Sequence, residues 1–295
     1  MSSETRGTIF LEKARVISQL AYDAEQFVLR LAAPKCAARA QPGSFAHLTC
    51  DAAIPMRRPL SIMRADARAG WIEVLYKVVG PGLQALAARK AGDEVSVLGP
   101  IGRPFTAHPE RPRTLLLGGG VGIPPMVFLA ERLKAQNQLR EPAIWKPLVL
   151  MGSEVPFPFR TRPSSIIIPG IPAGSIACMP MLEEWGVPSR LASLADFPGC
   201  FPGFVTALAE AWLASLGAAE LHEVEIFSCG PTPMLRASAQ LARRHGVPCQ
   251  VSLEEFMACA VGGCAGCTVQ VRTPEGPAMK RVCVDGPVFD AYSVF

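Results

Sequence analysis

Short stretches in which apolar and polar residues alternate occupy the first hundred or so positions of the chain. Alternation with a period of two is typical of half-buried β-strands. The stretches that fit strands are residues 14–17, 25–31, 44–48, 71–79 and 94–98. Turn signals such as Pro42-Gly43 and Gly92-Asp93 separate them, and one helix is expected at residues 83–90. The pattern predicts a small antiparallel β-barrel.

A second pattern begins after a cluster of prolines at residues 104–112. Apolar strands at 114–118, 147–151 and 223–228 alternate there with helices at 125–138, 205–216 and 232–245, which predicts a parallel sheet with crossover helices. Repeated prolines break the alternation between Gly152 and Gly203, and we expect an insertion loop there. The fold class expected is α+β multidomain, with a barrel over residues 1–106, an α/β parallel-sheet domain over 107–248 and a small C-terminal domain over 249–295.

Composition narrows the classes of function. Apolar residues make up 49% of the 295 residues and charged residues 18%, which excludes intrinsic disorder. The net charge of +4 is scattered without a basic run, so a nucleic-acid groove is not expected. No apolar stretch is long enough to span a membrane, and residues 1–6 lack the apolar core of a secretory signal. We expect a cytoplasmic protein whose thiols stay reduced.

Four of the ten cysteines lie close together near the C-terminus, with the spacing Cys259-x4-Cys264-x2-Cys267-x15-Cys283. This is the spacing of plant-type [2Fe–2S] ligation, in which four thiolates converge on one cluster. Small intervening residues allow the backbone to fold tightly and its amides to donate to the sulfurs; they include Gly262, Gly263 and Gly266. Structural zinc is the alternative, but it ordinarily uses two C-x2-C pairs. The other six cysteines are expected in the core or near the surface.

Two short motifs in the predicted barrel suit a flavin diphosphate. In Arg57-Arg-Pro-Leu-Ser61, a proline keeps the preceding arginine extended, so that its guanidinium can bind a diphosphate while the serine hydroxyl reaches a flavin ring. In Gly80-Pro-Gly-Leu83, a turn opens a helix whose free amides can hold phosphate. Each motif alone is equally compatible with an ordinary surface turn.

Two further motifs follow strands of the predicted sheet. Leu115-Leu-Leu-Gly-Gly-Gly-Val-Gly-Ile-Pro-Pro125 brings glycines to the start of a helix, where a diphosphate can approach the backbone. Ser228-Cys-Gly-Pro-Thr-Pro-Met234 again joins a strand to a helix. Both belong to the carboxyl edge at which open α/β sheets bind nucleotides. Cys229 there either faces a nicotinamide or is a buried small hydrophobe.

In this order the motifs resemble the ferredoxin–NADP reductase superfamily. The C-terminal runs Met257–Cys267 and Lys280–Phe289 are similar to the electron-transfer subunits of NAD-linked dihydroorotate dehydrogenases. The chain departs from that family at Leu83, where threonine is usual, at Phe256, where arginine is usual, and at Ala260, where glycine is usual. The resemblance covers nearly the whole chain, and its C-terminal motif is the most specific part.

The resemblance implies three cofactors or co-substrates, which are FAD between the barrel and the nucleotide domain, a [2Fe–2S] cluster, and NAD(P). The FAD contacts that it implies are Arg58, Pro59, Leu60, Ser61, Tyr76, Lys77, Val78, Gly82 and Leu83. The expected nucleotide contacts are Gly118, Gly119, Gly120, Gly122, Pro124, Cys229, Gly230 and Pro231. The implied cluster ligands are Cys259, Cys264, Cys267 and Cys283. No catalytic acid, base or nucleophile is expected, because the flavin joins two-electron to one-electron transfer.

The resemblance also implies a function in pyrimidine biosynthesis. Electrons would pass from an FMN-containing dihydroorotate dehydrogenase subunit, through the cluster and FAD, to NAD+, within a heterotetramer. One alternative keeps the cofactors but serves ferredoxin, a hydrogenase or another oxidoreductase. A second alternative is a scaffolding or regulatory subunit without turnover. The sequence leaves NAD and NADP open, because Glu154 favours a free ribose whereas Arg160 and Arg162 could receive a 2′-phosphate.

Overall fold

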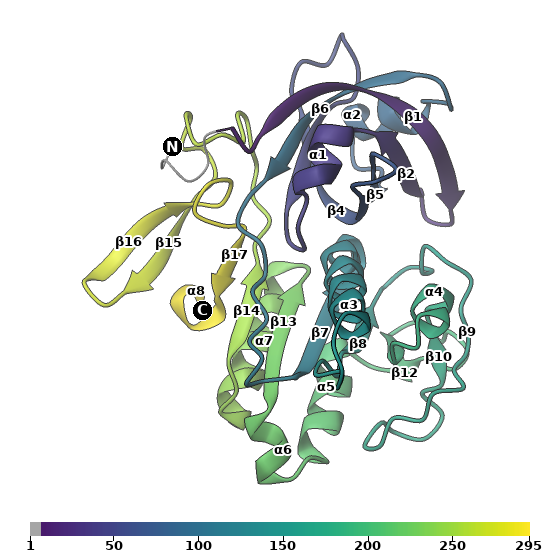
Figure 1. Cartoon of the computed structure of the whole chain (residues 1–295), viewed down its shortest axis with the longest axis vertical. Helices are drawn as coiled ribbons and strands as arrows, with labels where there is room; N and C mark the ends of the chain where they lie inside the picture. Colours follow the sequence, from purple (N-terminus) through teal and green to yellow (C-terminus); the bar gives the residue numbers. More distant parts are fainter. Residues whose placement is uncertain (1–6) are drawn as a thin grey trace. The chain divides into compact units, whose positions relative to one another are not determined.

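The structure is a computed structural model that describes residues 7–295, and the chain divides into two compact units (Figure 1). The first unit takes the residues up to Pro104 together with Leu253–Val288, and the second takes Phe105–Ser252 together with Phe289–Phe295. The expectation about a secretory signal concerns residues 1–6, which lie outside the described residues. Within the described part of the chain, no helix combines the length and apolar character needed to cross a membrane.

The first unit is built on a closed barrel of six strands in the order β1-β2-β5-β4-β3-β6. The strands are β1 (Phe10–Tyr22), β2 (Gln26–Ala32), β3 (Phe45–Thr49), β4 (Arg58–Asp66), β5 (Trp71–Lys77) and β6 (Glu94–Ile101). All neighbouring pairs are antiparallel. Alternate side chains such as Leu29, Leu31 and Val74 are fully buried. The predicted antiparallel barrel is confirmed by the closed strand order.

Two elements of the barrel were not expected from the sequence. Strand β4 begins at Arg58-Pro59 and ends at Asp66, so its polar ends and its proline resemble a turn. Helix α1 (Pro34–Arg39) is only 6 residues long and has no helical periodicity to detect. The helix expected at residues 83–90 is present as α2 (Pro81–Ala87).

The second unit contains a sheet in the order β12-β11-β8-β7-β13-β14-β17. Its strands are β7 (Arg113–Gly119), β8 (Leu148–Gly152), β11 (Ser189–Ser193), β12 (Phe201–Pro202), β13 (Val224–Cys229), β14 (Cys249–Ser252) and β17 (Val288–Asp290). The pairs from β12 to β14 are parallel, as predicted. Strands β7 and β13 are buried along nearly their whole length, which is usual for a parallel sheet covered by helices.

Crossover helices cover this sheet. Helix α3 (Ile123–Gln138) packs on β7, β8 and β13, helix α5 (Val205–Ala214) on β7, β8 and β11, and helix α7 (Thr232–His245) on β13 and β14. A short 3₁₀ turn, η2 (Gly120–Gly122), joins β7 to α3, and α6 (Ala218–His222) precedes β13. The glycine motifs therefore lie at the carboxyl ends of the two central strands, β7 and β13.

The proline-rich region between Gly152 and Gly203 has more regular structure than an insertion loop. It contains β11 of the main sheet, the pair β9 (Arg162–Pro163) and β10 (Ala177–Cys178), and helix α4 (Pro180–Glu184). Glu183 fastens the region internally, since its carboxylate accepts bonds from the Ser164 hydroxyl at 2.8 Å and the Ser165 amide at 2.6 Å. Side-chain hydrogen bonds hold this region together, and the pattern of apolar and polar residues does not reveal them. The sequence therefore gave no indication of its strands and helix.

The C-terminal segment, for which a domain over residues 249–295 is expected, is divided between the two compact units. Residues Leu253–Val288 group with the barrel and carry the hairpin β15 (Thr268–Thr273) and β16 (Gly276–Arg281), which Figure 1 shows in yellow. The last residues, with helix α8 (Ala291–Val294), group with the second unit. A segment this short buries too little apolar surface to be stable alone.

Candidate functional site

The first three cysteines of the motif lie on a tight loop between β14 and β15. Ala260 and Ala265 adopt left-handed backbone with φ of 56° and 54°, and Gly262 has φ of 83°. A Cβ on Gly262 would lie 2.6 Å from Cγ2 of Val284, so only glycine fits there. The expected steric role is therefore confirmed for Gly262, whereas Gly263 and Gly266 have neither a positive φ nor a close neighbour at the Cβ position.

Backbone amides of this loop point at its sulfurs. The Cys264 amide lies 3.4 Å from Cys259 Sγ, and the Gly266 amide lies 3.4 Å from Cys264 Sγ. Burial opposes ionisation of Cys259, but hydrogen bonds from the loop outweigh it and lower the pKa of this thiol to about 7. Amide donation of this kind stabilises thiolates, the form that binds metal.

Cys267, the third cysteine of the loop, meets Cys283 in the interior. Cys267 Sγ lies 3.3 Å from Cys283 Sγ, and the Cys283 amide lies 3.5 Å from Cys267 Sγ. Both residues are buried, and burial together with the neighbouring Cys267 raises the pKa of the Cys283 thiol to about 12. The sulfurs of Cys259 and Cys264 are thus contacted by amides of the loop, and those of Cys267 and Cys283 lie together in the interior. Among the described residues, no three Cys, His, Asp or Glu side chains converge on a single metal-binding point.

This donor set fits an iron–sulfur cluster better than it fits zinc. Four thiols stand at the predicted spacing, with amides directed at sulfurs of the loop. Cys264 is exposed, Cys259 is half-buried, and Cys267 and Cys283 are buried. A cluster held by these residues would therefore be covered by protein on the Cys267 and Cys283 side and open on the Cys264 side. The other six cysteines are free and, apart from half-buried Cys200, buried, as expected.

The two flavin motifs of the barrel come together in space. An ideal Cβ on Gly82 would lie 2.8 Å from Nη2 of Arg58 and 2.9 Å from its Cζ and Nε. The guanidinium of Arg58 therefore occupies the space that a side chain on Gly82 would fill, at the first turn of α2. The first amides of a helix have no partner within the helix. A guanidinium and free amides at one point form a suitable cradle for a diphosphate.

The neighbouring Arg57 is engaged elsewhere. Its Nη1 donates to the carbonyl oxygens of His47 at 2.9 Å and Ser96 at 3.1 Å, and its Nη2 donates to the Ser96 hydroxyl at 2.9 Å. Arg57 therefore ties β3 to β6. Arg58 donates from Nη1 to the carbonyls of Met56 at 2.6 Å and Arg57 at 3.2 Å, and within residues 7–295 no hydrogen bond occupies its Nε or Nη2. This contrast supports the assignment of Arg58 rather than Arg57 to the diphosphate.

The remaining flavin positions lie on β4 and β5. Ser61 pairs with Phe45 across β3 and β4, and Leu60 pairs with Ala46. Tyr76 is buried, and its hydroxyl donates to Gln19 Oε1 at 2.9 Å. The Val78 amide donates to the Glu25 carbonyl at 3.0 Å. The hydroxyl of Tyr76 and the amide of Val78 are therefore already used within the barrel, and any FAD contact along Tyr76, Lys77 and Val78 would use other atoms.

The two nucleotide motifs also pack against each other. A Cβ on Gly122 would lie 2.3 Å from the Cys229 carbonyl oxygen and 2.5 Å from the Gly230 nitrogen. A Cβ on Gly119 would lie 2.4 Å from Sδ of Met234. Gly119 and Gly122 are thus required by close contact with the second motif, and the parallel register sets Gly118 opposite Cys229. Cys229 is 1% exposed within its unit.

The structure shows the surroundings of Glu154, Arg160 and Arg162, the residues considered for the choice between NAD and NADP. Arg162 donates to the Pro180 carbonyl at 3.4 Å and lies 3.6 Å from the Glu184 carboxylate. Arg160 and Glu154 are exposed. The pairing of Arg162 with Glu184 makes it a weaker candidate for a 2′-phosphate.

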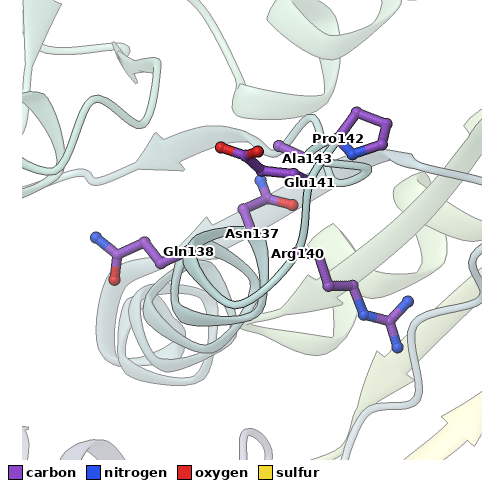
Figure 2. Close-up of a pocket in the computed structure, with 6 residues that line it drawn as sticks. All are labelled: Asn137, Gln138, Arg140, Glu141, Pro142 and Ala143. Atoms are coloured by element: carbon purple, nitrogen blue, oxygen red, sulfur yellow. The ribbon is translucent and has the colours of Figure 1, made fainter.

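Among the hollows formed by the described residues are two that the sequence did not predict. One, of about 730 Å³, lies at the end of α3, where Figure 2 shows Gln138 and Arg140 pointing in different directions. It is at the end of α3 away from the glycine motifs. The other, of about 330 Å³, lies in the first unit between Arg39, Arg103 and Cys283. These residues are far apart in the sequence, so no local motif could have found them.

Comparisons with known proteins agree with this geometry. The family model for the iron–sulfur cluster binding domain of dihydroorotate dehydrogenase B matches residues 254–295. The electron transfer subunit of dihydroorotate dehydrogenase B (NAD+) of Caldanaerobacter subterraneus subsp. tengcongensis is 34% identical over 254 residues, which are 86% of either chain. The corresponding subunit of Bacillus caldolyticus is 33% identical over 288 residues, 96% of this chain and 98% of that one.

Solved structures share the fold. The NADH-dependent reduced ferredoxin–NADP oxidoreductase, described for flavin-based electron bifurcation, aligns with a TM-score of 0.75 at 24% identity, over 96% of this chain and 90% of that one. A ferredoxin reductase of carbazole 1,9a-dioxygenase aligns with a TM-score of 0.61 at 20% identity, over 81% and 67%. At these identities the likeness concerns the fold alone.

Proposed function

Because this chain belongs to the family of electron transfer subunits of NAD+-linked dihydroorotate dehydrogenase B, we propose that it transfers electrons from a catalytic dihydroorotate dehydrogenase subunit to NAD+. The observation that carries the proposal is the four-cysteine motif, with amides directed at its sulfurs, inside a segment that matches the family's iron–sulfur binding domain. The chain has the cofactors of that family, FAD and a [2Fe–2S] cluster, and uses NAD. It acts in pyrimidine biosynthesis.

The residues of the chain bind and orient these groups rather than react. When bound, FAD and the cluster supply the link between two-electron exchange with a nicotinamide and one-electron transfer to a partner. We assign Arg58, with the first turn of α2 at Gly82 and Leu83, to the FAD diphosphate, and Ser61 to the flavin ring. The support for this is the contact of the Arg58 guanidinium with Gly82. Pro59, Leu60, Tyr76, Lys77 and Val78 complete the proposed FAD site.

The nucleotide assignment rests on the second unit. The proposed contacts are Gly118, Gly119, Gly120, Gly122, Pro124, Cys229, Gly230 and Pro231. Their support is that both motifs end neighbouring strands of a parallel sheet and touch through Gly122 and Cys229. In such sheets the carboxyl edge binds nucleotides.

The cluster ligands we propose are Cys259, Cys264, Cys267 and Cys283. Cys264 is exposed, so the partner subunit would approach from its side. A heterotetramer with the catalytic subunit is the assembly proposed. We also propose a cytoplasmic location, supported by ten cysteines that are all free, as is usual in a reducing compartment.

The test is anaerobic purification of the untagged chain from its native cells, followed by a visible spectrum and an assay of NAD+ reduction by dihydroorotate. We expect flavin and iron–sulfur absorption, a catalytic partner carrying FMN, and NADH formation that depends on both subunits. A complex that is bleached by NADH but inert to dihydroorotate would contradict the proposed substrate and favour service to another oxidoreductase. A colourless chain would contradict the electron-transfer role altogether.

A further inference from the structure

Gln19 of strand β1 is bonded to the C-terminal end of helix α2. Its Nε2 donates to three carbonyl oxygens, those of Leu86 at 3.2 Å, Ala87 at 2.9 Å and Arg89 at 2.9 Å. The last carbonyls of a helix lack their usual partners within the helix. Here a side chain that lies 67 to 70 positions earlier in the sequence supplies the missing donor.

The orientation of the Gln19 amide is fixed by its surroundings. A carbonyl oxygen only accepts hydrogen bonds, so the atom that faces the three carbonyls must be the amide nitrogen. The amide oxygen, Oε1, accepts from the Tyr76 hydroxyl at 2.9 Å. Tyr76 is 1% exposed, and burial raises the pKa of its hydroxyl above the usual value, so the hydroxyl stays protonated and remains a donor. Both ends of the Gln19 amide therefore have partners.

Gln19 and Tyr76 belong to the inner face of the barrel. In the register of the sheet, Gln19 stands opposite Leu29, which is fully buried. Tyr76 stands opposite Phe27, and the two rings stack with their centroids 5.4 Å apart. Residues opposite each other on paired strands, and residues two apart on one strand, share a face. The bond from Tyr76 to Gln19 therefore passes over β2 and joins β5 to β1 beside α2.

A second contact holds the segment that follows α2. The guanidinium of Arg89 donates from Nη2 to the Cys50 carbonyl at 3.0 Å and to the Asp51 carboxylate at 2.7 Å. Cys50 and Asp51 follow β3 and begin the loop that leads to Arg58 at the start of β4. The C-terminal end of α2 is thus tied both to β1 and to the loop before Arg58.

The opposite end of α2 carries the contact that supports the proposed FAD site. Gly82 lies at this end, and the guanidinium of Arg58 occupies the space where a side chain of Gly82 would be. The helix has only 7 residues and is about 10 Å long, so a displacement of its C-terminal end also shifts Gly82. The position of the Arg58 guanidinium therefore depends on how the far end of α2 is held.

We propose that Gln19, together with the Tyr76 hydroxyl, is a positioning residue for FAD: it holds α2 so that the backbone of Gly82 supports the guanidinium of Arg58. The inference rests on the proposed function and deepens it, because it adds a residue of β1 that lies outside both flavin motifs. It also gives the Tyr76 hydroxyl a role in FAD binding that acts through Gln19 rather than by contact with the cofactor.

The experiment compares the full-length wild-type chain with Gln19→Leu, Gln19→Glu and Tyr76→Phe. Leucine removes the polar atoms, glutamate keeps the size but directs a carboxylate at the three carbonyls, and phenylalanine removes a single bond. Arg30→Leu is the matched control. It removes the bonds from Arg30 to the Glu73 carboxylate at 2.6 and 2.9 Å, but Arg30 follows the inward-facing Leu29 and so lies on the outer face of the same barrel.

Three readouts are measured for each variant. They are the rate at which the holoprotein releases FAD, the Kd for FAD in a fluorescence titration of the full chain after removal of its flavin, and amide hydrogen exchange at residues 81–89. The Kd is also measured for Gln19→Leu in an Arg58→Ala background, which asks whether Gln19 acts through the guanidinium.

With Gln19→Leu we expect the Kd for FAD to rise about tenfold or more, FAD release to become faster, and hydrogen exchange at 81–89 to increase. The effects should be larger for Gln19→Glu and smaller for Tyr76→Phe, and Arg30→Leu should change the Kd by less than about twofold. In the Arg58→Ala background, Gln19→Leu should weaken FAD binding by less than about threefold further, because the group that it positions is already absent.

An FAD affinity of Gln19→Leu equal to that of wild type would overturn the proposal. A loss fully additive with that of Arg58→Ala would also overturn it, since the effect would not pass through the guanidinium. If Gln19→Leu does not fold, Tyr76→Phe decides, and an unchanged Kd in that variant counts against the proposal in the same way. A wild-type chain that binds no FAD would refute the proposed function and this inference together, whereas equal binding by wild type and Gln19→Leu would refute the inference alone.

Discussion

Substitution of Gly82 by alanine separates the stability of the barrel from its affinity for FAD. The new methyl group would be 2.8 to 2.9 Å from three atoms of the Arg58 guanidinium, whereas carbon and nitrogen atoms in contact are about 3.5 Å apart or more. The side chain that must move is flexible, so the backbone need not shift. We expect the guanidinium to be displaced by on the order of 1 Å from the first turn of α2.

Gly82→Ala should raise the stability of the apoprotein and lower its affinity for FAD. Alanine in place of a helical glycine stabilises the apoprotein by up to about 0.5–1 kcal/mol, because the unfolded chain loses less conformational freedom on folding. Loss of a charge-assisted hydrogen bond to the diphosphate weakens FAD binding by about 1.5–3 kcal/mol, which is about 10- to 150-fold in Kd. Thermal unfolding of the apoprotein and a fluorescence titration with FAD measure the two effects separately.

The double variant with Arg58→Ala decides whether the loss acts through Arg58. In that background Gly82→Ala should weaken FAD binding little further, since the displaced group is already absent. Additive losses would show that the methyl group obstructs FAD directly. Unchanged affinity in Gly82→Ala would refute the diphosphate assignment, and a destabilised apoprotein would refute the argument that only a flexible side chain must move.

Three more outcomes are expected. Cys264→Ser should remove the iron–sulfur absorption and leave FAD bound; a retained cluster spectrum would exclude Cys264 as a ligand. Gly122→Ala should lower the free energy of unfolding by about 1–3 kcal/mol in chemical denaturation, because its methyl group would meet the Cys229 carbonyl at 2.3 Å, and a stable variant would show that the motifs are not in contact. Glu183→Gln should destabilise the chain by about 1–2 kcal/mol at pH 7. Burial raises the pKa of Glu183, but the hydrogen bonds from Ser165 and its neighbours outweigh burial and hold the pKa at about 2. Because folding lowers this pKa, the difference in melting temperature between the wild type and Glu183→Gln should have its full size above about pH 4.5. It should shrink as the pH falls toward 2.

Much of the fold could be predicted because burial follows the local periodicity. The buried residues Leu29 and Leu31 of β2 alternate with partly exposed neighbours, and the apolar run of β7 reflects a strand covered on both faces. Strand β11 was missed because its residues Ser189–Ser193 are all buried although three of the five are polar or charged. Arg190 is buried there with its Nη2 bonded to the Ile166 carbonyl at 2.6 Å. Tertiary hydrogen bonds of this kind leave no signal in a local pattern.

In the candidate site, too, the local features could be predicted from the sequence and the tertiary contacts could not. Each motif was visible because its chemistry is local: a thiolate spacing, a proline after an arginine, glycines at the start of a helix. The contacts between these motifs join residues that are distant in the sequence. Arg58 contacts Gly82, and Gly122 contacts Cys229, only after the barrel and the sheet have formed. A single glycine or arginine carries little information, but two weak motifs that the topology brings into contact constrain each other.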